Sequence, residues 1–246
     1  GDAAWQPVLD ERMAILGPQP SGETLLYSDE RLPVKATGID GMDVLALILE
    51  ADLEAPPVGE LDTRFIGRLE REQQLTLEFD RPLDEVDGMP VLMVDGWVEY
   101  PYSQTMFAAW QAGAALAAPT LEVRNADGEW QTLHEQFGYP AGMPRRMALP
   151  LEKLPRGVTA LRLRTNQEIY WDRIAVIDAE PGVTICDAAL ANGIEIEHAC
   201  EKSCACTTCH VYVREGFDSL EPSDEDEDDL LDKAWGLEPD SRLSCQ

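Results

Sequence analysis

Apolar and polar residues alternate over much of the first 177 residues with the period of two that a half-buried strand requires. Residues 75–79 and residues 161–164 show this alternation most clearly. Two further segments, 91–94 and 169–177, are apolar runs of strand length. The pattern therefore predicts extended strands in these four segments.

Residues 121–133 have the pattern of a β-hairpin. Two strand-like stretches, 121–124 and 129–133, flank an Asn-Ala-Asp-Gly sequence of residue types that favour turns. Several short strands separated by such turns are typical of a sandwich, so we expect a jelly-roll-like β-sandwich over residues 1–177. Within it only residues 43–50 and 107–116 have a weak helical pattern. We expect its tryptophans to lie in the core, namely Trp97, Trp110, Trp130 and Trp171.

The last 69 residues have a different, mixed α+β pattern. Thr184 followed by Asp187 resembles a capping box at the start of a short helix over 187–191, which Gly193 ends. A strand is expected at 211–213. We therefore place a domain boundary between residues 177 and 178, since 246 residues are enough for two ordinary domains.

A second helix is predicted from about residue 224 to residue 235. Ser223 is a candidate N-cap and Gly236 a natural end. The spacing of Leu231 and Trp235 predicts that both face inward. Residues 224–229 are all acidic, and carboxylates at a helix N-terminus are stabilised by the macrodipole.

The chain is strongly acidic, with a formal net charge of −28. This charge excludes nucleic acid and anionic membrane surfaces as probable targets and favours partners with a basic face. Residues 178–246 hold 18 acidic and 4 basic residues, so the charge density is highest in the C-terminal part. The apolar stretch at 106–118 is too short for a membrane span, and we expect no membrane insertion.

Four cysteines near the C-terminus have the spacing of an iron–sulfur site: Cys200, Cys206, Cys209 and Cys245. Three thiolates on one tight loop of small residues, with a fourth from far along the chain, are suited to hold a binuclear cluster. A structural zinc site also takes four thiolates, but such sites more often pair two short Cys-x2-Cys knuckles. Only one such pair occurs here. The spacing therefore predicts one 2Fe–2S cluster.

Four stretches of the C-terminal part share further motifs, namely 187–198, 200–210, 214–220 and 231–246. Together they resemble an adrenodoxin-type 2Fe–2S ferredoxin over about residues 180–246, closest to the bacterial ferredoxins of iron–sulfur cluster assembly. The five residues between Cys200 and Cys206 favour this branch over plant-type ferredoxins, which have four. The resemblance implies a β-grasp fold and one-electron transfer rather than catalysis.

The resemblance also implies partners. A ferredoxin reductase would supply the electron, and a basic-faced acceptor such as the assembly machinery or a monooxygenase would receive it. The acidic helix of this family meets basic patches, so Asp226, Asp229 and Asp232 are the predicted docking residues. Cys204 lies in the cluster loop outside the ligand spacing and is a possible auxiliary residue. His210 is expected to tie that loop to the backbone of the domain.

Ferredoxins of this type begin with a hairpin, whose place is occupied here by the end of the β domain. Either residues 158–178 supply that hairpin or its first strand is missing; a natural fusion, a fragment or a composite chain would each explain the join. Residues 30–177 weakly resemble the C-terminal β domain of FG-GAP propeller and tetratricopeptide proteins, which assigns no chemistry.

Two other functions are left open. The chain is a binding or assembly module with a structural metal centre, or it is the electron-entry subunit of a larger oxidoreductase. All six cysteines lie in the small domain, a usage that suits a reducing compartment. We expect the bacterial cytoplasm in preference to a mitochondrial matrix.

Overall fold

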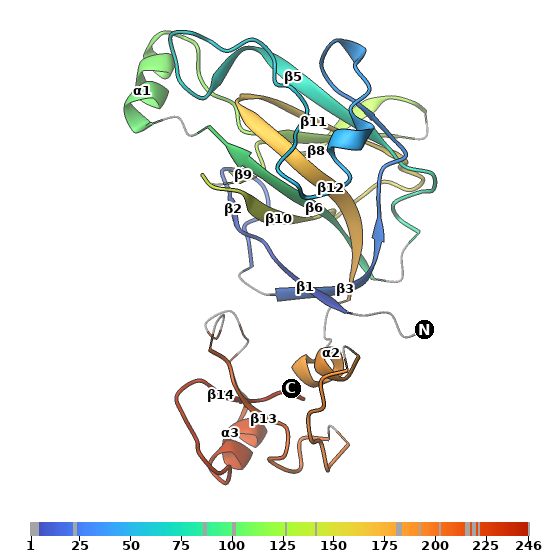
Figure 1. Ribbon diagram of the computed structural model, residues 1–246, viewed down its shortest axis with the longest axis vertical. Coiled ribbons are helices and arrows are strands. Elements are labelled where there is room, and N and C mark those ends of the chain that lie inside the picture. The colour runs from blue at the N-terminus through green and yellow to red at the C-terminus, as the bar shows by residue number, and fades with distance from the viewer. Residues whose placement is uncertain are drawn as a thin grey trace. The chain divides into compact units, whose positions relative to one another are not determined.

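The computed structural model contains a mainly β part and a smaller α+β part (Figure 1). It describes residues 5–21, 24–85, 88–99, 102–125, 127–140, 142–180, 184–191, 193–201, 203–214, 217, 220 and 222–245. The chain divides into two compact units. One comprises Leu9–Pro20 and Asp29–Ala179, and the other comprises Gly1–Val8, Ser21–Ser28 and Glu180–Gln246.

Two five-stranded sheets form the β part. The first has the order β1-β3-β12-β6-β10 and the second the order β4-β5-β11-β7-β8. The strands of the first sheet are β1 (Gln6–Leu9), β3 (Thr24–Arg31), β12 (Ile169–Glu180), β6 (Met89–Val98) and β10 (Arg145–Pro150). Those of the second are β4 (Lys35–Thr37), β5 (Arg68–Glu78), β11 (Ala160–Gln167), β7 (Thr120–Arg124) and β8 (Trp130–His134). A short pair, β2 (Arg12–Met13) and β9 (Tyr139–Pro140), lies outside both.

The two sheets share one apolar core. Alternate residues of each strand point into it, as the period of two predicted. The contributors include Leu92, Val94, Ile174 and Val176 from the first sheet, and Leu75, Leu77, Leu121 and Leu161 from the second. The predicted β-sandwich is therefore confirmed, and so is the hairpin at 121–133, which forms β7 and β8.

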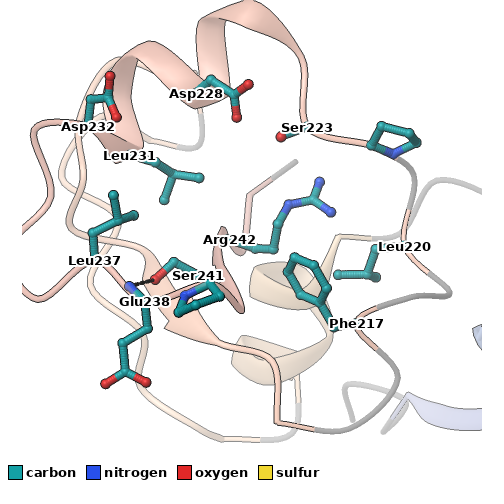
Figure 2. Close-up of a pocket in the computed structure, with 12 residues that line it drawn as sticks. Phe217, Leu220, Ser223, Asp228, Leu231, Asp232, Leu237, Glu238, Ser241 and Arg242 are labelled. Carbon is teal, nitrogen blue, oxygen red and sulfur yellow. Dashed lines mark hydrogen bonds between the residues drawn. The ribbon is translucent and has the colours of Figure 1, made fainter.

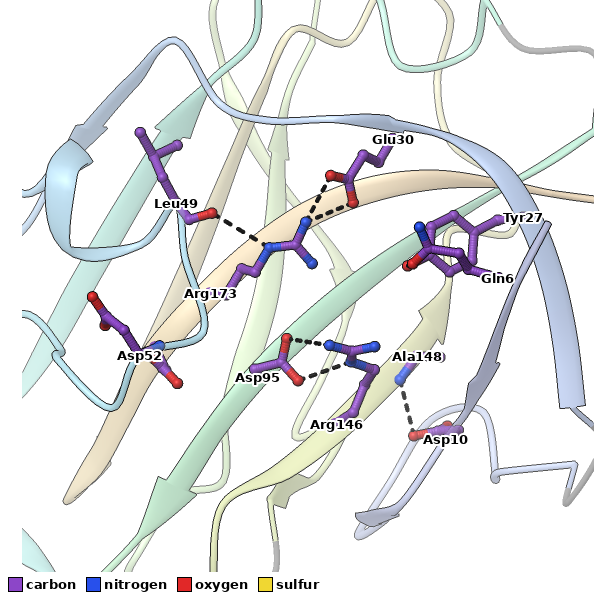
Figure 3. A network of polar contacts seen from close by, with 11 residues as sticks. Gln6, Asp10, Tyr27, Glu30, Leu49, Asp52, Asp95, Arg146, Ala148 and Arg173 are labelled. Atoms are coloured by element: carbon purple, nitrogen blue, oxygen red, sulfur yellow. Dashed lines mark hydrogen bonds and ion pairs between the residues drawn. The ribbon is translucent and has the colours of Figure 1, made fainter. Parts of the chain in front are cut away.

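Ion pairs across neighbouring strands reinforce the order of the first sheet (Figure 3). Asp95 on β6 accepts two hydrogen bonds from Arg146 on β10, at 2.8 and 3.0 Å. Arg173 on β12 donates to Glu30 on β3 at 2.6 Å. Pairs with two hydrogen bonds are more directional than single ones, so they favour this strand order over others.

The strands expected to supply a ferredoxin hairpin take part in the sandwich. β11 pairs with β5 and β7 in one sheet, and β12 pairs with β6 in the other. The structure thus places residues 160–167 and 169–180 in different sheets, instead of pairing them with each other across residues 158–178. Both strands use their alternating apolar residues to fill the sandwich core.

The two helical segments predicted within the β part differ from the helices that the structure contains. The helix α1 spans Ser103–Gln111; the candidate segment 43–50 holds only the short 3-10 turn η2 (Leu45–Leu47), and a second such turn, η1 (Ile39–Gly41), precedes it. Trp110, on α1, is 65% exposed, so its predicted place in the core is wrong. Trp110 stacks on Phe107, with their ring centroids 5.8 Å apart, while Ala109 is the buried residue of α1.

Among its described residues, the smaller unit contains two α-helices and a pair of strands that form a two-stranded sheet. They are α2 (Ile185–Ala191), α3 (Glu225–Leu231), β13 (His210–Tyr212) and β14 (Ser241–Leu243). The predicted cap of α2 is confirmed, because the Asp187 N–H donates to Thr184 Oγ1 at 3.1 Å. The predicted N-cap of α3 is wrong by one residue. Asp224, not Ser223, accepts from the Glu227 N–H, at 2.7 Å.

We expect Asp62→Asn to lower the thermal midpoint of the β part at neutral pH. Asp62 is buried and accepts hydrogen bonds from Arg64 and Arg68. The Arg64 hydrogen bond is the main cause that holds the pKa of Asp62 well below its ordinary value of 3.8. The ionised Asp62 carboxylate therefore stabilises the fold fully above pH 3.8, and this stabilisation is lost as the pH falls through the lowered pKa.

Thermal unfolding of both proteins between about pH 7 and about pH 2.5 measures this linkage. The gap between the two midpoints should narrow toward the acid end. A gap that is constant over the whole range would contradict the role of Asp62.

Candidate metal centre

Cys200 and Cys206 lie on one curled loop between α2 and β13. Glu201 and Cys204 have left-handed backbone conformations, with φ of 54° and 48°, and turn the loop tightly. Ser203 donates through its N–H and its hydroxyl to the Cys200 carbonyl, at 3.2 and 2.8 Å. The Ala199 N–H donates to Thr208 Oγ1 at 2.9 Å and closes the base of the loop.

This loop favours a thiolate at Cys200. The Ala205 N–H and then the Cys206 thiol hydrogen-bond to it, and together they lower the pKa of Cys200 to about 6. Cys206 Sγ also lies 3.1 Å from Thr208 Oγ1. The loop thus directs hydrogen-bond donors at sulfur, which is the arrangement that a ligated thiolate requires.

Cys209 and Cys245 form a second, buried pair. Their sulfurs are 3.3 Å apart. The register of β13 and β14 pairs His210 with Leu243, which brings Cys209 beside Ser244 and Cys245. Ser244 secures this end, because both its N–H and its hydroxyl donate to the Cys209 carbonyl, at 3.1 and 2.8 Å.

Burial makes this second pair unfavourable as free thiolates. It is the main cause that raises the pKa of Cys209 to about 12, with the neighbouring Cys245 adding to it. A cation bound between such sulfurs removes this penalty by replacing their protons. The buried pair therefore suits metal ligation.

The four sulfurs meet in twos, Cys200 with Cys206 and Cys209 with Cys245. Within the described residues, no three Cys, His, Asp or Glu side chains converge on a single point as one metal ion would need. A binuclear cluster requires a different donor set, in which two thiolates bind each iron. The residues present fit that donor set.

The other two cysteines occupy different environments. Cys186 is fully buried in the apolar cluster of this unit, where it packs as a small apolar side chain. Cys204 is partly exposed, and burial together with nearby Cys245 and the acidic residues of α3 raises its pKa. Neither belongs to the two sulfur pairs described above.

His210 ties β13 to β14, although not through the backbone acceptor that we expected. Its Nε2 lies 2.8 Å from Ser241 Oγ. Its ring also meets Tyr212 edge-on, with centroids 5.0 Å apart. Ser241 provides the partner because the strand register places it near, a fact that the sequence alone does not reveal.

The predicted docking residues all lie on the exposed side of α3. Asp226 and Asp229 are within the helix and Asp232 is its C-cap; all three are exposed. Four acidic residues occupy the first turn, where the helix dipole favours them. The prediction that these side chains are available to a partner is thus compatible with their placement.

Glu227 is the acidic residue of α3 that sequence reasoning missed. It is 1% exposed, and its carboxylate accepts two hydrogen bonds from Arg242, both at 2.9 Å. It also accepts from the Leu243 N–H, at 2.7 Å. Glu227 therefore joins α3 to β14, the strand that leads to Cys245.

Comparison with known proteins places this centre in a defined class. Residues 169–246 match the family model described as a 2Fe-2S iron-sulfur cluster binding domain. The 2Fe-2S ferredoxin of Pseudomonas aeruginosa is 85% identical over 72 residues, which are 29% of this chain and 64% of that protein. That of Escherichia coli K12 is 79% identical over 72 residues, 65% of its length.

One solved structure is also similar in sequence. The crystal structure of the ISC-like [2Fe-2S] ferredoxin (FdxB) from Pseudomonas putida JCM 20004 is 53% identical, over 30% of this chain and 69% of that one, with a TM-score of 0.27. The chain spans less than two thirds of the length of the curated relatives above.

The C-terminal part of the chain is a 2Fe–2S cluster-binding domain. More narrowly, this part is similar to 2Fe–2S ferredoxins, and its cofactor is one 2Fe–2S cluster. The predicted family, fold class and cofactor are thereby confirmed for this part. The weak resemblance of residues 30–177 to other β domains stays a prediction. None of the helices among the described residues combines the length and hydrophobicity needed to cross a membrane.

Proposed function

We propose that this protein is a one-electron carrier. The observation that supports the proposal most directly is the pairing of four cysteine sulfurs, two and two, in a domain of the 2Fe–2S ferredoxin family. When bound, the cluster supplies one-electron redox chemistry, in which the electron enters from a reduced donor and leaves to an oxidised acceptor. The chain returns to its starting state after each cycle.

In this proposal Cys200, Cys206, Cys209 and Cys245 are the cluster ligands. The Ala205 N–H and the hydroxyl of Thr208 surround the first pair with hydrogen-bond donors, which offset added negative charge. The second pair and its Ser244 contacts are buried and exclude water. The residues thus bind, orient and shield the centre.

The partners belong to the proposal as well. A ferredoxin reductase donates the electron, and a basic-faced acceptor, such as iron–sulfur assembly machinery or a monooxygenase, receives it in the bacterial cytoplasm. Asp226, Asp229 and Asp232 present negative charge for a short-lived complex, because opposite charge raises encounter rates without tight binding. Residues 178–246 perform this role.

Metal analysis of the anaerobically reconstituted protein tests the function. We expect a brown protein with iron and sulfide in equal amounts, and an EPR signal of a binuclear cluster after one-electron reduction. Colourless protein that retains zinc would instead favour a structural metal centre. Iron-loaded protein that cannot be reduced would contradict the carrier role while leaving the cluster in place.

A further inference from the structure

The ferredoxin unit has an open cavity of about 560 Å³ beside α3 (Figure 2). None of the four cysteines is among the residues that line it; the lining comes from α3, from β14 and from residues that precede or follow them in the chain. The residues that line it are Phe217, Leu220, Pro222, Ser223, Asp228, Leu231, Asp232, Leu237, Glu238, Pro239, Ser241 and Arg242. A volume of this size is large enough for one or two side chains of another molecule.

Large apolar side chains form much of the wall. Phe217, Leu220, Leu231 and Leu237 contribute to it. Leu231 is 6% exposed and fixed in the core of the unit, whereas Leu237 is 50% exposed. An apolar hollow that opens to solvent is a typical interaction site, because monomeric proteins otherwise cover such surfaces.

The rim of the cavity is acidic. Its one cation, Arg242, is held by Glu227, and the rim residue Glu238 is paired with Arg214. Within the described part of the chain, Asp228 and Asp232 have no such basic partner, and both are exposed. Two carboxylates thus stand beside an apolar wall without neutralisation, which favours a ligand that carries both an apolar group and a cation.

The chain that contributes Leu237 exposes another large apolar residue nearby. Trp235 is 93% exposed. Gly236, between them, has a φ of +78° that turns the chain, and its carbonyl accepts from the Tyr212 hydroxyl at 2.6 Å. Tryptophan is enriched among the residues that dominate protein interfaces, so this exposure points to a protein partner.

We propose that this cavity receives an apolar side chain of the electron-donating reductase, with a lysine or arginine beside it that pairs with Asp228 and Asp232. The inference rests on the carrier function proposed above and adds the anchor point of the complex. The acidic helix then acts in two ways. Its exposed carboxylates speed encounter, and the two next to the cavity also hold the docked complex.

Reduction kinetics of the reconstituted holoprotein by a bacterial flavoprotein ferredoxin reductase test the anchor. Each reduced nicotinamide gives two electrons and so reduces two carrier molecules. Leu237→Ala should raise the KM for the carrier about fivefold with little change in kcat, as loss of an interface anchor does. Ile194→Ala is the matched control, because Ile194 is 59% exposed in the same unit but does not line the cavity.

A charge-matched pair of variants separates local docking from general attraction. Asp228→Asn with Asp232→Asn, and Asp226→Asn with Asp229→Asn, remove the same charge from the same helix segment. The Asp228 and Asp232 double variant should raise the KM for the carrier about threefold more than the Asp226 and Asp229 double variant. It should also weaken the salt dependence of the reduction rate at least as much. Equal KM values for the two pairs, or for the Leu237 and Ile194 variants, would overturn the proposal.

Failure of the anchor and failure of the carrier function give different results. If dithionite reduces the wild-type holoprotein but the reductase does not, the proposed anchor is overturned and the proposed carrier function is left intact. Protein that neither agent reduces would overturn both. Visible spectra of every variant before the assay show whether its cluster is intact, so that a folding defect is not read as lost docking.

Discussion

Replacing Cys206 with serine is expected to abolish the native cluster. Cys206 hydrogen-bonds to Cys200, and these two cysteines are the more exposed of the two sulfur pairs. Soft thiolates select iron–sulfur clusters, and a serine hydroxyl is a harder and less acidic ligand. We expect the iron content after reconstitution to fall by more than about tenfold, together with the visible absorbance and the reduced-state EPR signal.

Cys204→Ser is the matched control for this experiment. Cys204 lies two residues away on the same loop and is exposed to a similar degree, yet it belongs to neither pair. Its variant should keep the iron content and the EPR signal. Unchanged colour and redox behaviour in Cys206→Ser, or equal losses in both variants, would remove the basis of the ligand assignment.

The sequence predicted those strands and turns that are determined by residues close to one another along the chain. The alternation at 75–79 and 161–164 gives β5 and β11, and the Asn125 turn gives the β7–β8 hairpin. Asn125 Oδ1 accepts from the Asp127 and Glu129 N–H groups, at 3.0 and 2.9 Å. Such turns are decided within a few residues, so the sequence reveals them without knowledge of the fold.

Other elements depend on distant residues and were missed. The strand β4 has only three residues, and pairing with β5 rather than its own composition keeps it extended. β1 likewise has one buried residue, Val8, among four. Short strands with so few apolar positions carry little periodic signal, since the neighbouring strand determines their conformation.

The same distinction between local and distant causes applies to the candidate metal centre. The ligand spacing is a local property and pointed to the four cysteines at once, whereas their grouping in twos needed the register of β13 and β14. The inward-facing role predicted for Trp235 is wrong because α3 ends at Leu231, so that helical spacing no longer applies four residues later. A change of backbone conformation moves every later side chain to a new face.

Glu227→Gln is expected to destabilise the ferredoxin unit by about 3 kcal/mol. The carboxylate of Glu227 is almost fully buried, and the Arg242 side chain that it pairs with is only 12% exposed. Removing one charge leaves the other buried without its partner, and this cost exceeds the net value of the original pair. The Leu243 N–H also loses its charged acceptor.

Urea unfolding of the holoprotein, followed by the visible absorbance of the cluster, reports on this unit alone. Glu225→Gln is the control, since Glu225 is an exposed residue of the same helix turn and its variant should stay within about 0.5 kcal/mol of wild type. Adding Arg242→Met to Glu227→Gln should recover part of the loss, because no buried charge is then unpaired. Coincident transitions for the Glu227 and Glu225 variants would show that the contact between α3 and β14 does not hold Cys245 in place.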